Sequence, residues 1–317
     1  MKALALLSGG LDSTLAVKLI IDQGIEVEAV NFTTPFCLCN RRGKCETATV
    51  SKKLGIPYKI INVGAEYLRI IKNPKHGYGK NMNPCIDCRI FMLKKAKTVA
   101  KQIDASFIFT GDVVEERPMS QRLHALRIIE KETGLTRKIV RPLSAKLLPE
   151  TEAEKEGWID RNKLLDIRGR SRKRQIELAK NFRIADYPCP SGGCLLTYKE
   201  FATKVRDLLK HKKRLTLKDI ALIKVGRHFR RGKNKIVVGR NESENKQLTN
   251  LKGKSDYIFE VPDWGSPTTI LQGPKTKKAI MDAASLAARY SDAEKGRVLV
   301  NYGRDSLENH LIVDKNE

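Results

Sequence analysis

The N-terminal half of the sequence alternates short apolar runs with segments whose apolar positions recur every three or four residues. The predicted strands are residues 3–7, 27–32, 58–63 and 107–110, and the predicted helices are residues 13–23, 46–54 and 89–103. Strands that alternate with helices are typical of an α/β fold, in which helices cover both faces of a parallel sheet. Ligands of such sheets bind beyond the carboxyl ends of the strands.

The pattern changes in the second half of the chain. Residues 168–182 open with a dense basic run and continue as a helix, and residues 187–194 form a loop because they contain two prolines and two glycines. Beyond this loop, short strands and one helix at 276–289 predict a small basic α+β domain. The sequence therefore predicts two domains, residues 1–200 and residues 201–317.

The charge of the chain is far from balanced. It has 61 Lys and Arg residues against 36 Asp and Glu residues, a net charge of +25. A basic surface neutralises phosphates and releases their counterions, so this excess favours a polyanionic partner. The alternative is a solvated surface rich in both Lys and Glu, as in some thermophile proteins, but acidic residues do not keep pace here. The composition favours a nucleic acid.

No apolar run is long enough to predict a membrane span. The first apolar run, ALALL, ends at a loop-forming SGG and lacks the length and the cleavage site of a signal peptide. A short buried strand is the better interpretation of this run. The expected location is cytoplasmic, with no membrane partner.

The motif SGGLDS lies between the first predicted strand and the first predicted helix. Gly9 and Gly10 allow the backbone to turn tightly and to approach a ligand, and Ser8 and Ser13 add hydroxyl groups. The helix that follows directs its N–H groups and its positive dipole end at the loop, which favours an anion. Asp12 suits a phosphate site only with a bridging Mg²⁺. Taken alone, the motif is also compatible with a glycine turn capped by Ser13.

SGGxDS after a first strand resembles the PP-loop signature of the ATP pyrophosphatase superfamily, whose fold is the Rossmann-like one of the adenine nucleotide alpha hydrolases. It differs from the Walker sequence, which ends in Gly-Lys-Ser/Thr. The resemblance implies that the loop holds the pyrophosphate part of ATP with Mg²⁺, and that AMP is transferred to a carbonyl or carboxyl oxygen. The residues implied for this site are Ser8, Gly9, Gly10, Asp12, Ser13, Asn31, Phe32, Gly111, Asp112 and Lys146. Within this set Asn31 and Phe32 are expected near adenine, Asp112 near Mg²⁺, and Lys146 near the phosphates.

Seven cysteines fall into three clusters. They are Cys37, Cys39 and Cys45, then Cys85 and Cys88, then Cys189 and Cys194. An odd number without a secretion signal argues against a disulfide framework and favours metal binding or thiol chemistry. Cys85 and Cys88 lie where a loop enters a basic helix, and a helix N-terminus stabilises a reactive thiolate.

These cysteine segments resemble those of PP-loop tRNA thiolases, which replace an oxygen of uridine or cytidine by sulfur. Relatives use either a cysteine persulfide with a second, resolving cysteine, or three cysteines that hold a [4Fe–4S] cluster with one open iron. The resemblance favours the cluster, with Cys85, Cys88 and Cys194 as its ligands and, together with Asp12, as catalytic residues. Cys189 is the alternative third ligand, and a CxxC disulfide or a zinc site is the alternative to sulfur transfer.

The first cysteine cluster stays open. Cys37, Cys39 and Cys45 either hold zinc with an unidentified fourth ligand, or relay sulfur near the adenine site, or have no special role. A thiolase also needs a sulfur donor, which is either sulfide or a persulfide-carrying protein.

Two basic segments are the candidates for binding tRNA. GRSRKRQ at 169–175 offers cations to phosphates, and the segment at 225–248 interleaves basic residues with an aromatic, which suits RNA. KIVVGRNESENKQL, VPDWGSP and AARYSDAEKGRVLV resemble the NFACT-R module of RNA-associated proteins, over about residues 225–302. The candidate RNA-binding residues are Arg170, Arg172, Lys173, Arg174, Arg227, Arg230, Arg231 and Arg240. Asn241 and Asn245 are implied by the resemblance too, with turn or core roles as the alternative.

Together these features predict an ATP-dependent tRNA sulfurtransferase. Its N-terminal domain adenylates a carbonyl of a tRNA base, and sulfur then replaces the activated oxygen. One alternative is a PP-loop synthetase or amidotransferase that adenylates a small carboxylic acid, which leaves the net charge of +25 unexplained. Another is an RNA-binding adaptor without catalysis, which the intact SGGLDS motif disfavours.

Overall fold

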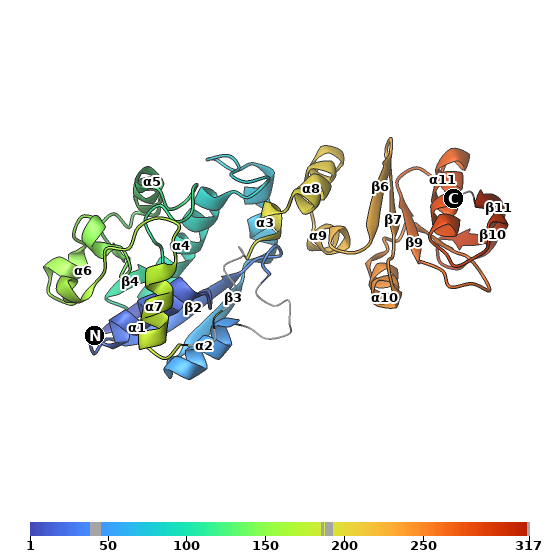
Figure 1. The fold of residues 1–317 in the computed structure, drawn as a ribbon. Coiled ribbons are helices and arrows are strands. Elements are labelled where there is room, and N and C mark those ends of the chain that lie inside the picture. Colours follow the sequence, from blue (N-terminus) through green and yellow to red (C-terminus); the bar gives the residue numbers. More distant parts are fainter. Residues whose placement is uncertain (39–45, 185–186, 188–192, 316–317) are drawn as a thin grey trace. The chain divides into compact units, whose positions relative to one another are not determined.

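The computed structural model describes residues 1–38, 46–184, 187 and 193–315 (Figure 1). The chain divides into two compact units, Met1–Lys199 and Glu200–Glu317. Within the described ranges, no helix has the length and apolar character needed to cross a membrane.

A five-stranded parallel sheet forms the centre of the first unit. Its strands are β1 (Lys2–Leu6), β2 (Glu26–Thr33), β3 (Tyr58–Asn62), β4 (Phe107–Thr110) and β5 (Ile139–Val140), in the order β3-β2-β1-β4-β5. All four neighbouring pairs are parallel. The order reverses between β1 and β4, so the carboxyl ends of these strands flank the point where open α/β sheets bind ligands. The prediction of an α/β fold with a parallel sheet is confirmed.

Helices cover both faces of this sheet. They are α1 (Leu11–Ile21), α2 (Glu46–Leu54), α3 (Gly64–Lys72), α4 (Cys85–Gln102), α5 (Leu123–Thr133), α6 (Glu152–Lys155) and α7 (Lys173–Asn181). Helix α1 contacts β2, β4 and α7, whereas α4 contacts β1, β4 and α5. Figure 1 shows these two groups on opposite faces of the sheet. Ala3 and Ala5 of β1 are fully buried against Ala16 and Val17 of α1, and these small side chains allow close packing of the helix on the sheet.

Two helix starts differ from the sequence prediction. Helix α4 begins at Cys85, four residues early, because Pro84 takes the N-cap position and Asp87 lies in the first turn. Helix α7 begins only at Lys173, so Arg170 and Arg172 precede it rather than lie on it. Both cysteines of the CxxC motif are therefore in the first turn of a helix.

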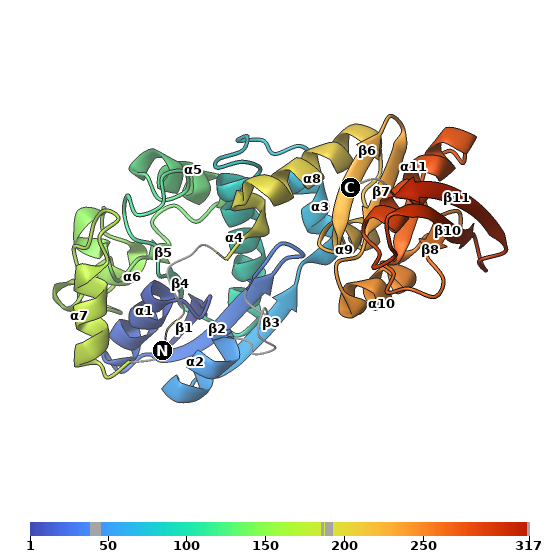
Figure 2. The ribbon, with the colours of Figure 1, turned by 45° about the vertical axis from the view of Figure 1, so that its right-hand side comes forward.

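The second unit is α+β, as predicted. Its helices are α8 (Lys199–His211), α9 (Leu217–Ile223), α10 (Glu242–Leu251) and α11 (Lys277–Arg289). Its strands are β6 (Arg227–Arg231), β7 (Asn234–Val238), β8 (Tyr257–Glu260), β9 (Thr269–Gln272), β10 (Gly296–Gly303) and β11 (Asn309–Lys315), in the order β11-β10-β8-β9-β7-β6. Helix α11 packs on this antiparallel sheet through a row of buried alanines (Figure 2). Of the helices in this unit the sequence analysis predicted only α11, although α8 is equally long and has buried apolar residues with helical spacing at Phe201, Val205 and Leu208.

Candidate functional site

The SGGLDS loop joins β1 to α1 and is held by its own hydroxyl groups. Ser8 Oγ and Ser13 Oγ lie 3.1 Å apart, and Ser13 Oγ also donates to the Gly10 carbonyl at 2.9 Å. The backbone N–H groups of Ser8 and Gly10 each donate to one of these hydroxyls at 3.3 Å. The loop therefore has a defined shape, with the first turn of α1 directly after it.

Two glycines allow this loop to pack against its neighbours. Gly9 has φ +78°, and a Cβ atom there would lie 2.6 Å from Glu46 Cβ and 2.8 Å from the Thr47 nitrogen. A Cβ atom on Gly111 would lie 2.5 Å from both the Cα and the nitrogen of Ser13. The resemblance implied Gly111 for the ATP site, and the structure puts it in backbone contact with the SGGLDS loop.

Gly9→Ala is expected to lower the free energy of unfolding by about 2 kcal/mol, because the new methyl group meets backbone atoms of α2 at a positive φ. Urea denaturation followed by circular dichroism measures this change. Gly10→Ala is the matched control, since Gly10 has φ −79° and its Cβ would meet nothing closer than Ser8 Oγ at 3.4 Å. Equal losses in both variants would contradict the steric argument.

The end of β2 lies beside the loop, as the sequence predicted. The Asn31 side-chain amide donates to the Leu7 carbonyl at 2.8 Å, and the Thr47 hydroxyl donates to the same carbonyl at 3.1 Å. Asn31 and Phe32 are both buried. Asn31 thus fixes the distance between the ends of β1 and β2, where adenine is expected.

Asp12 lies in a cluster of incompletely paired polar side chains. Its Oδ2 is 3.8 Å from the Arg172 guanidinium. Its Oδ1, the Arg172 Nε and both polar atoms of the Gln175 amide are buried and have no hydrogen-bond partner in the part of the chain that the structure describes. Burial raises the Asp12 pKa, and the positive charges of Arg172 and Arg117 oppose that rise. Buried polar atoms normally have partners, so this cluster has the character of a ligand site.

Glu116 is a second carboxylate of this cluster, and the sequence analysis missed it. Burial, followed by repulsion from Asp12, raises its pKa to about 7. A lone Glu in a loop gives no signal in the sequence. The sequence feature that comes closest to predicting Glu116 is its position, five residues after Gly111 and beyond the end of β4, at the ligand-binding edge of the sheet.

The sequence analysis expected the Asp112 carboxylate near Mg²⁺, and in the structure this carboxylate has three protein partners. It forms a buried ion pair with Arg89 of α4, and it accepts from the Gln121 amide at 3.0 Å and the Thr110 hydroxyl at 2.9 Å. Burial alone would raise its pKa, but Arg89 and Arg141 outweigh burial and hold the pKa at about 2. In this structure Asp112 joins β4 to α4.

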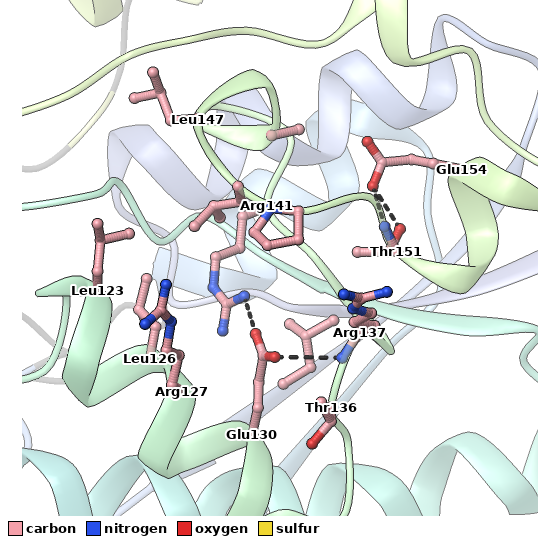
Figure 3. Close-up of a pocket in the computed structure, with 14 residues that line it drawn as sticks. Leu123, Leu126, Arg127, Glu130, Thr136, Arg137, Arg141, Leu147, Thr151 and Glu154 are labelled. Carbon is pink, nitrogen blue, oxygen red and sulfur yellow. Dashed lines mark hydrogen bonds and ion pairs between the residues drawn. The ribbon is translucent and has the colours of Figure 1, made fainter.

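Lys146 and Arg141 also find partners within the first unit. The Lys146 ammonium donates to the Asn162 carbonyl at 2.9 Å. Arg141 lines a cavity of about 410 Å³ beside α5, where its Nη1 donates to Glu130 Oε1 at 2.5 Å (Figure 3). The Arg137 backbone N–H donates to the other oxygen of Glu130 at 3.3 Å. The positive charge expected of this stretch is therefore partly neutralised by Glu130.

Four cysteines come together in the first unit, and three of them, Cys37, Cys88 and Cys194, lie around Tyr67. Cys85 and Cys88 stand in the first turn of α4, and Cys37 and Cys194 form an isolated antiparallel β-bridge. Tyr67 is buried, and its pKa is raised well above the usual value, first by burial and then by Cys88, Cys194 and Cys37. The structure thus brings Cys37 to the three predicted site cysteines, whereas the sequence grouped it with Cys39 and Cys45. Those two residues and Cys189 lie outside the described residues.

Burial opposes the thiolate that the helix N-terminus was expected to stabilise. Burial raises the pKa of Cys85, and it raises the pKa of Cys88 to about 11 and that of Cys194 to about 12. Arg89 opposes burial at Cys85 and Cys88 but does not outweigh it. Loss of water thus dominates over the helix dipole, and these groups are thiols at neutral pH unless an ion takes the place of the proton.

The phosphate loop and the cysteines share their cations. Arg117 lowers the pKa of both Asp12 and Cys85. Arg89 pairs with Asp112 and also lowers the pKa of Cys85 and Cys88. Gly111 packs on Ser13 of the SGGLDS loop, and the next residue, Asp112, pairs with Arg89 directly after Cys88, so the two sites are neighbours. Neither arginine was identified from the sequence.

The predicted RNA-binding residues divide into two groups. Five of them contact other side chains: Arg172 lies at Asp12, and Arg227 lies 4.6 Å from the Tyr290 ring. Arg174 pairs with Asp166 at 2.6 Å, and Arg240 pairs with Glu244 at 2.9 Å. Arg230 forms two bonds to Asp207, at 2.8 and 2.6 Å. The side chains of Arg170, Lys173 and Arg231 have no protein partner among the described residues. Asn241 caps α10 and Asn245 bonds to Ser266 and Thr268, which are the turn and core roles. Three cations thus remain fully available to phosphates.

Comparisons with known proteins agree with both halves of this description. Residues 1–146 match the family model "Thiamine biosynthesis protein (ThiI)", and residues 226–316 match "NFACT protein RNA binding domain". The tRNA-specific 2-thiouridylase MnmA of Symbiobacterium thermophilum is 30% identical over 127 residues, covering 35% of this chain and 33% of that protein. A probable tRNA sulfurtransferase of Thermococcus kodakarensis is 29% identical over 151 residues, covering 45% and 36%. The chain thus spans about a third of the length of these relatives.

Solved structures are similar at low identity. A 4-thiouridine synthetase in complex with RNA and ATP has a TM-score of 0.38 at 22% identity, covering 66% of this chain and 50% of that one. The U34-tRNA thiolase NcsA of Methanococcus maripaludis with its [4Fe–4S] cluster has a TM-score of 0.37 at 19% identity, covering 70% of each. The two family models confirm the resemblance found in the sequence: residues 1–146 are similar to the ThiI family, and residues 226–316 are similar to the NFACT RNA-binding domain.

Proposed function

We propose that this protein is an ATP-dependent tRNA sulfurtransferase. The observation that carries the proposal is the adjacency of two sites in one unit, the SGGLDS loop with Asp12 and the cysteines around Tyr67. Arg117 acts on both, through Asp12 and through Cys85. An enzyme that activates a base with ATP and then attacks it with sulfur needs both groups within reach of one substrate atom.

The first step is adenylation of a base carbonyl. The carbonyl oxygen attacks the α-phosphorus of ATP, the bond between the α and β phosphates breaks, and pyrophosphate leaves. The Ser8 and Ser13 hydroxyls and the N-terminal N–H groups of α1 hold the pyrophosphate. In the second step a sulfur nucleophile attacks the activated carbon, and AMP leaves with the former carbonyl oxygen.

The described residues fit a Mg²⁺ ion at Asp12. Asp12 Oδ1 is buried without a partner, and the Glu116 carboxylate next to it is destabilised by Asp12. Two neighbouring carboxylates with spare oxygens are the ligands that Mg²⁺ takes beside nucleotide phosphates. We therefore assign Asp12 and Glu116 as the ligands of the ion, which would neutralise charge on the leaving pyrophosphate. Asp112 is not assigned to the ion, because its carboxylate pairs with Arg89.

We favour a [4Fe–4S] cluster over zinc at these cysteines. Cys85, Cys88 and Cys194 lie close enough to influence one another's pKa, and Arg89 acts on Cys85 and Cys88, so an anionic cluster would meet positive charge there. The cluster would carry the extra sulfur, supplied by sulfide or by a persulfide-carrying protein.

The cations without protein partners are the best candidates for contacts to tRNA phosphates. Arg231→Ala is expected to weaken tRNA binding and to reduce the slope of log Kd against log salt by about one, because one phosphate contact is lost. Fluorescence anisotropy at several salt concentrations measures both. Lys101→Ala, an exposed cation at the end of α4, is the control. Equal changes of slope in the two variants would mean that the second unit holds no defined phosphate contact.

Mass spectrometry of tRNA nucleosides tests the proposed function as a whole. A strain lacking the gene is expected to lose one thionucleoside, and the wild-type gene is expected to restore it. Unchanged thionucleosides in the deletion strain would refute tRNA thiolation. If the purified protein then releases pyrophosphate only with a small carboxylic acid, the synthetase alternative is correct.

A further inference from the structure

Two distant segments of the first unit are joined at Cys37 and Cys194. The Leu38 N–H donates to the Gly193 carbonyl at 3.0 Å, and the Leu195 N–H donates to the Phe36 carbonyl at 2.9 Å. These bonds flank the bridge between Cys37 and Cys194 instead of joining the two cysteines directly. The cysteines are therefore a non-hydrogen-bonded antiparallel pair.

This type of pair brings side chains closest together. The two Cα atoms of such a pair lie about 4.5 Å apart, and both Cβ atoms point to the same face. A disulfide requires Cα atoms about 4.4 to 6.8 Å apart, so the backbone already meets the requirement. In the structure neither cysteine is in a disulfide.

Cys37 is also placed to be the attacking group. The Thr34 backbone N–H donates to Cys37 Sγ at 3.2 Å, and the Thr34 hydroxyl lies 3.4 Å from the same sulfur. These two contacts fix the position of the Cys37 sulfur next to the segment that carries Cys194. Thr34 follows directly after β2, which anchors this turn.

We infer that Cys37 is a further residue of the cysteine site, and that its thiol closes a reversible cross-strand disulfide with Cys194. The oxidant is a small disulfide such as oxidised glutathione. The Cys37 thiolate attacks one sulfur of the oxidant and forms a mixed disulfide, and the first thiolate leaves. Cys194 then releases its proton to solvent and attacks Cys37 Sγ, and the second thiolate leaves. Two protein thiols are thereby oxidised to one disulfide, while the oxidant is reduced to two thiols.

The disulfide would control the proposed sulfur site. Its consequence rests on the proposed function, because Cys194 is one of the three proposed cluster ligands. A Cys194 held by Cys37 is unable to bind iron or sulfur, so oxidation closes the site and a reducing thiol reopens it. Cys37 is therefore not one of the assigned ligands, but its disulfide with Cys194 determines whether all three ligands are available.

Peptide mapping of the full-length, cluster-free protein tests the disulfide itself. The protein is treated with oxidised glutathione, alkylated, digested with trypsin and analysed by mass spectrometry without reduction. We expect a cross-linked species of peptides 19–41 and 184–199, which separates after reduction. Each peptide holds two cysteines, so matched variants identify the bond. The cross-link should vanish in Cys37→Ser and Cys194→Ser, and persist in Cys39→Ser and Cys189→Ser.

Three outcomes would overturn the inference. They are a cross-link that survives in Cys37→Ser, oxidation confined to Cys85 and Cys88 within peptide 81–89, and no disulfide at all under conditions where a free-thiol reagent shows that the cysteines are consumed. None of these depends on tRNA or ATP. A failed thiolation assay with an intact cross-link would therefore count against the proposed function alone.

Iron binding measures the consequence separately. Oxidised wild-type protein is expected to take up several-fold less iron and sulfide during reconstitution than the reduced protein, whereas Cys37→Ser should take up the same amount after either treatment. Visible absorbance and iron analysis report the loaded cluster. Equal iron uptake by oxidised and reduced wild-type protein, with the disulfide present, would refute the control of the site by Cys37.

Discussion

Asp12→Asn is expected to slow pyrophosphate release from ATP by about 100- to 1000-fold, the usual effect of removing one electrostatic group aimed at a reacting centre. Asn keeps the shape of the side chain but loses the charge that would hold Mg²⁺. The Asp12 Oδ1 atom is buried without a partner, so no described contact of that oxygen is lost in the folded protein. A pyrophosphate-release assay at saturating ATP measures the change.

Asp22→Asn is the matched control for this experiment. Asp22 follows the other end of α1, where its carboxylate pairs with Lys18 on the surface. Its loss should change pyrophosphate release by less than about twofold, since exposed ion pairs contribute little. Full activity of Asp12→Asn with a normal magnesium dependence would remove Asp12 from the ATP site. If the Glu116→Gln variant also loses pyrophosphate release, the result would support Asp12 and Glu116 as the two ligands of the ion.

Cys194→Ser is expected to lower tRNA thiolation by at least about 100-fold, because a hydroxyl neither binds iron as a thiolate does nor carries a sulfur atom. Pyrophosphate release should continue, since the phosphate loop and its serines do not touch Cys194. Thionucleosides in tRNA, counted by mass spectrometry after a reaction in vitro, measure the loss. The two readouts separate sulfur transfer from activation of the base.

Cys189→Ser distinguishes the two candidates for the third cysteine. The sequence left both open, and only Cys194 lies among the described residues, beside Tyr67 and Cys88. We expect Cys189→Ser to keep most of the thiolation activity. A loss in Cys189→Ser together with full activity in Cys194→Ser would reverse the assignment.

A local pattern made strands β1 to β4 and helices α1, α2, α4 and α7 predictable, whereas helices α3 and α5 and strand β5 were not predicted. Buried parallel strands are short apolar runs, and the helices between them repeat their apolar positions with the helical period. Helix α2 and strand β4 begin and end where the sequence predicts, at 46–54 and 107–110. Helices α8 to α10 were missed as well, although α8 repeats Phe201, Val205 and Leu208 with the helical period among its charged residues.

Side-chain roles were predictable only where the backbone sets them. Gly9 and Gly10 in SGGLDS indicate a tight turn whatever surrounds them, and Gly9 does adopt a positive φ. Asp112 was different. An acidic residue after a strand suits a metal ion, but Arg89, 23 positions earlier in the chain, pairs with its carboxylate. Nothing in the sequence near Asp112 announces that partner.

The sequence by itself determined the parallel α/β fold, the position of the phosphate loop and the basic character of the second unit. These follow from local periodicity, from glycine geometry and from composition. Only the tertiary structure decided which cysteines meet, which arginines are already paired, and that burial makes Cys88 and Cys194 thiols rather than thiolates. The physical reason is that burial and Coulomb energy depend on distance in space, and the residues concerned come from segments far apart in the chain.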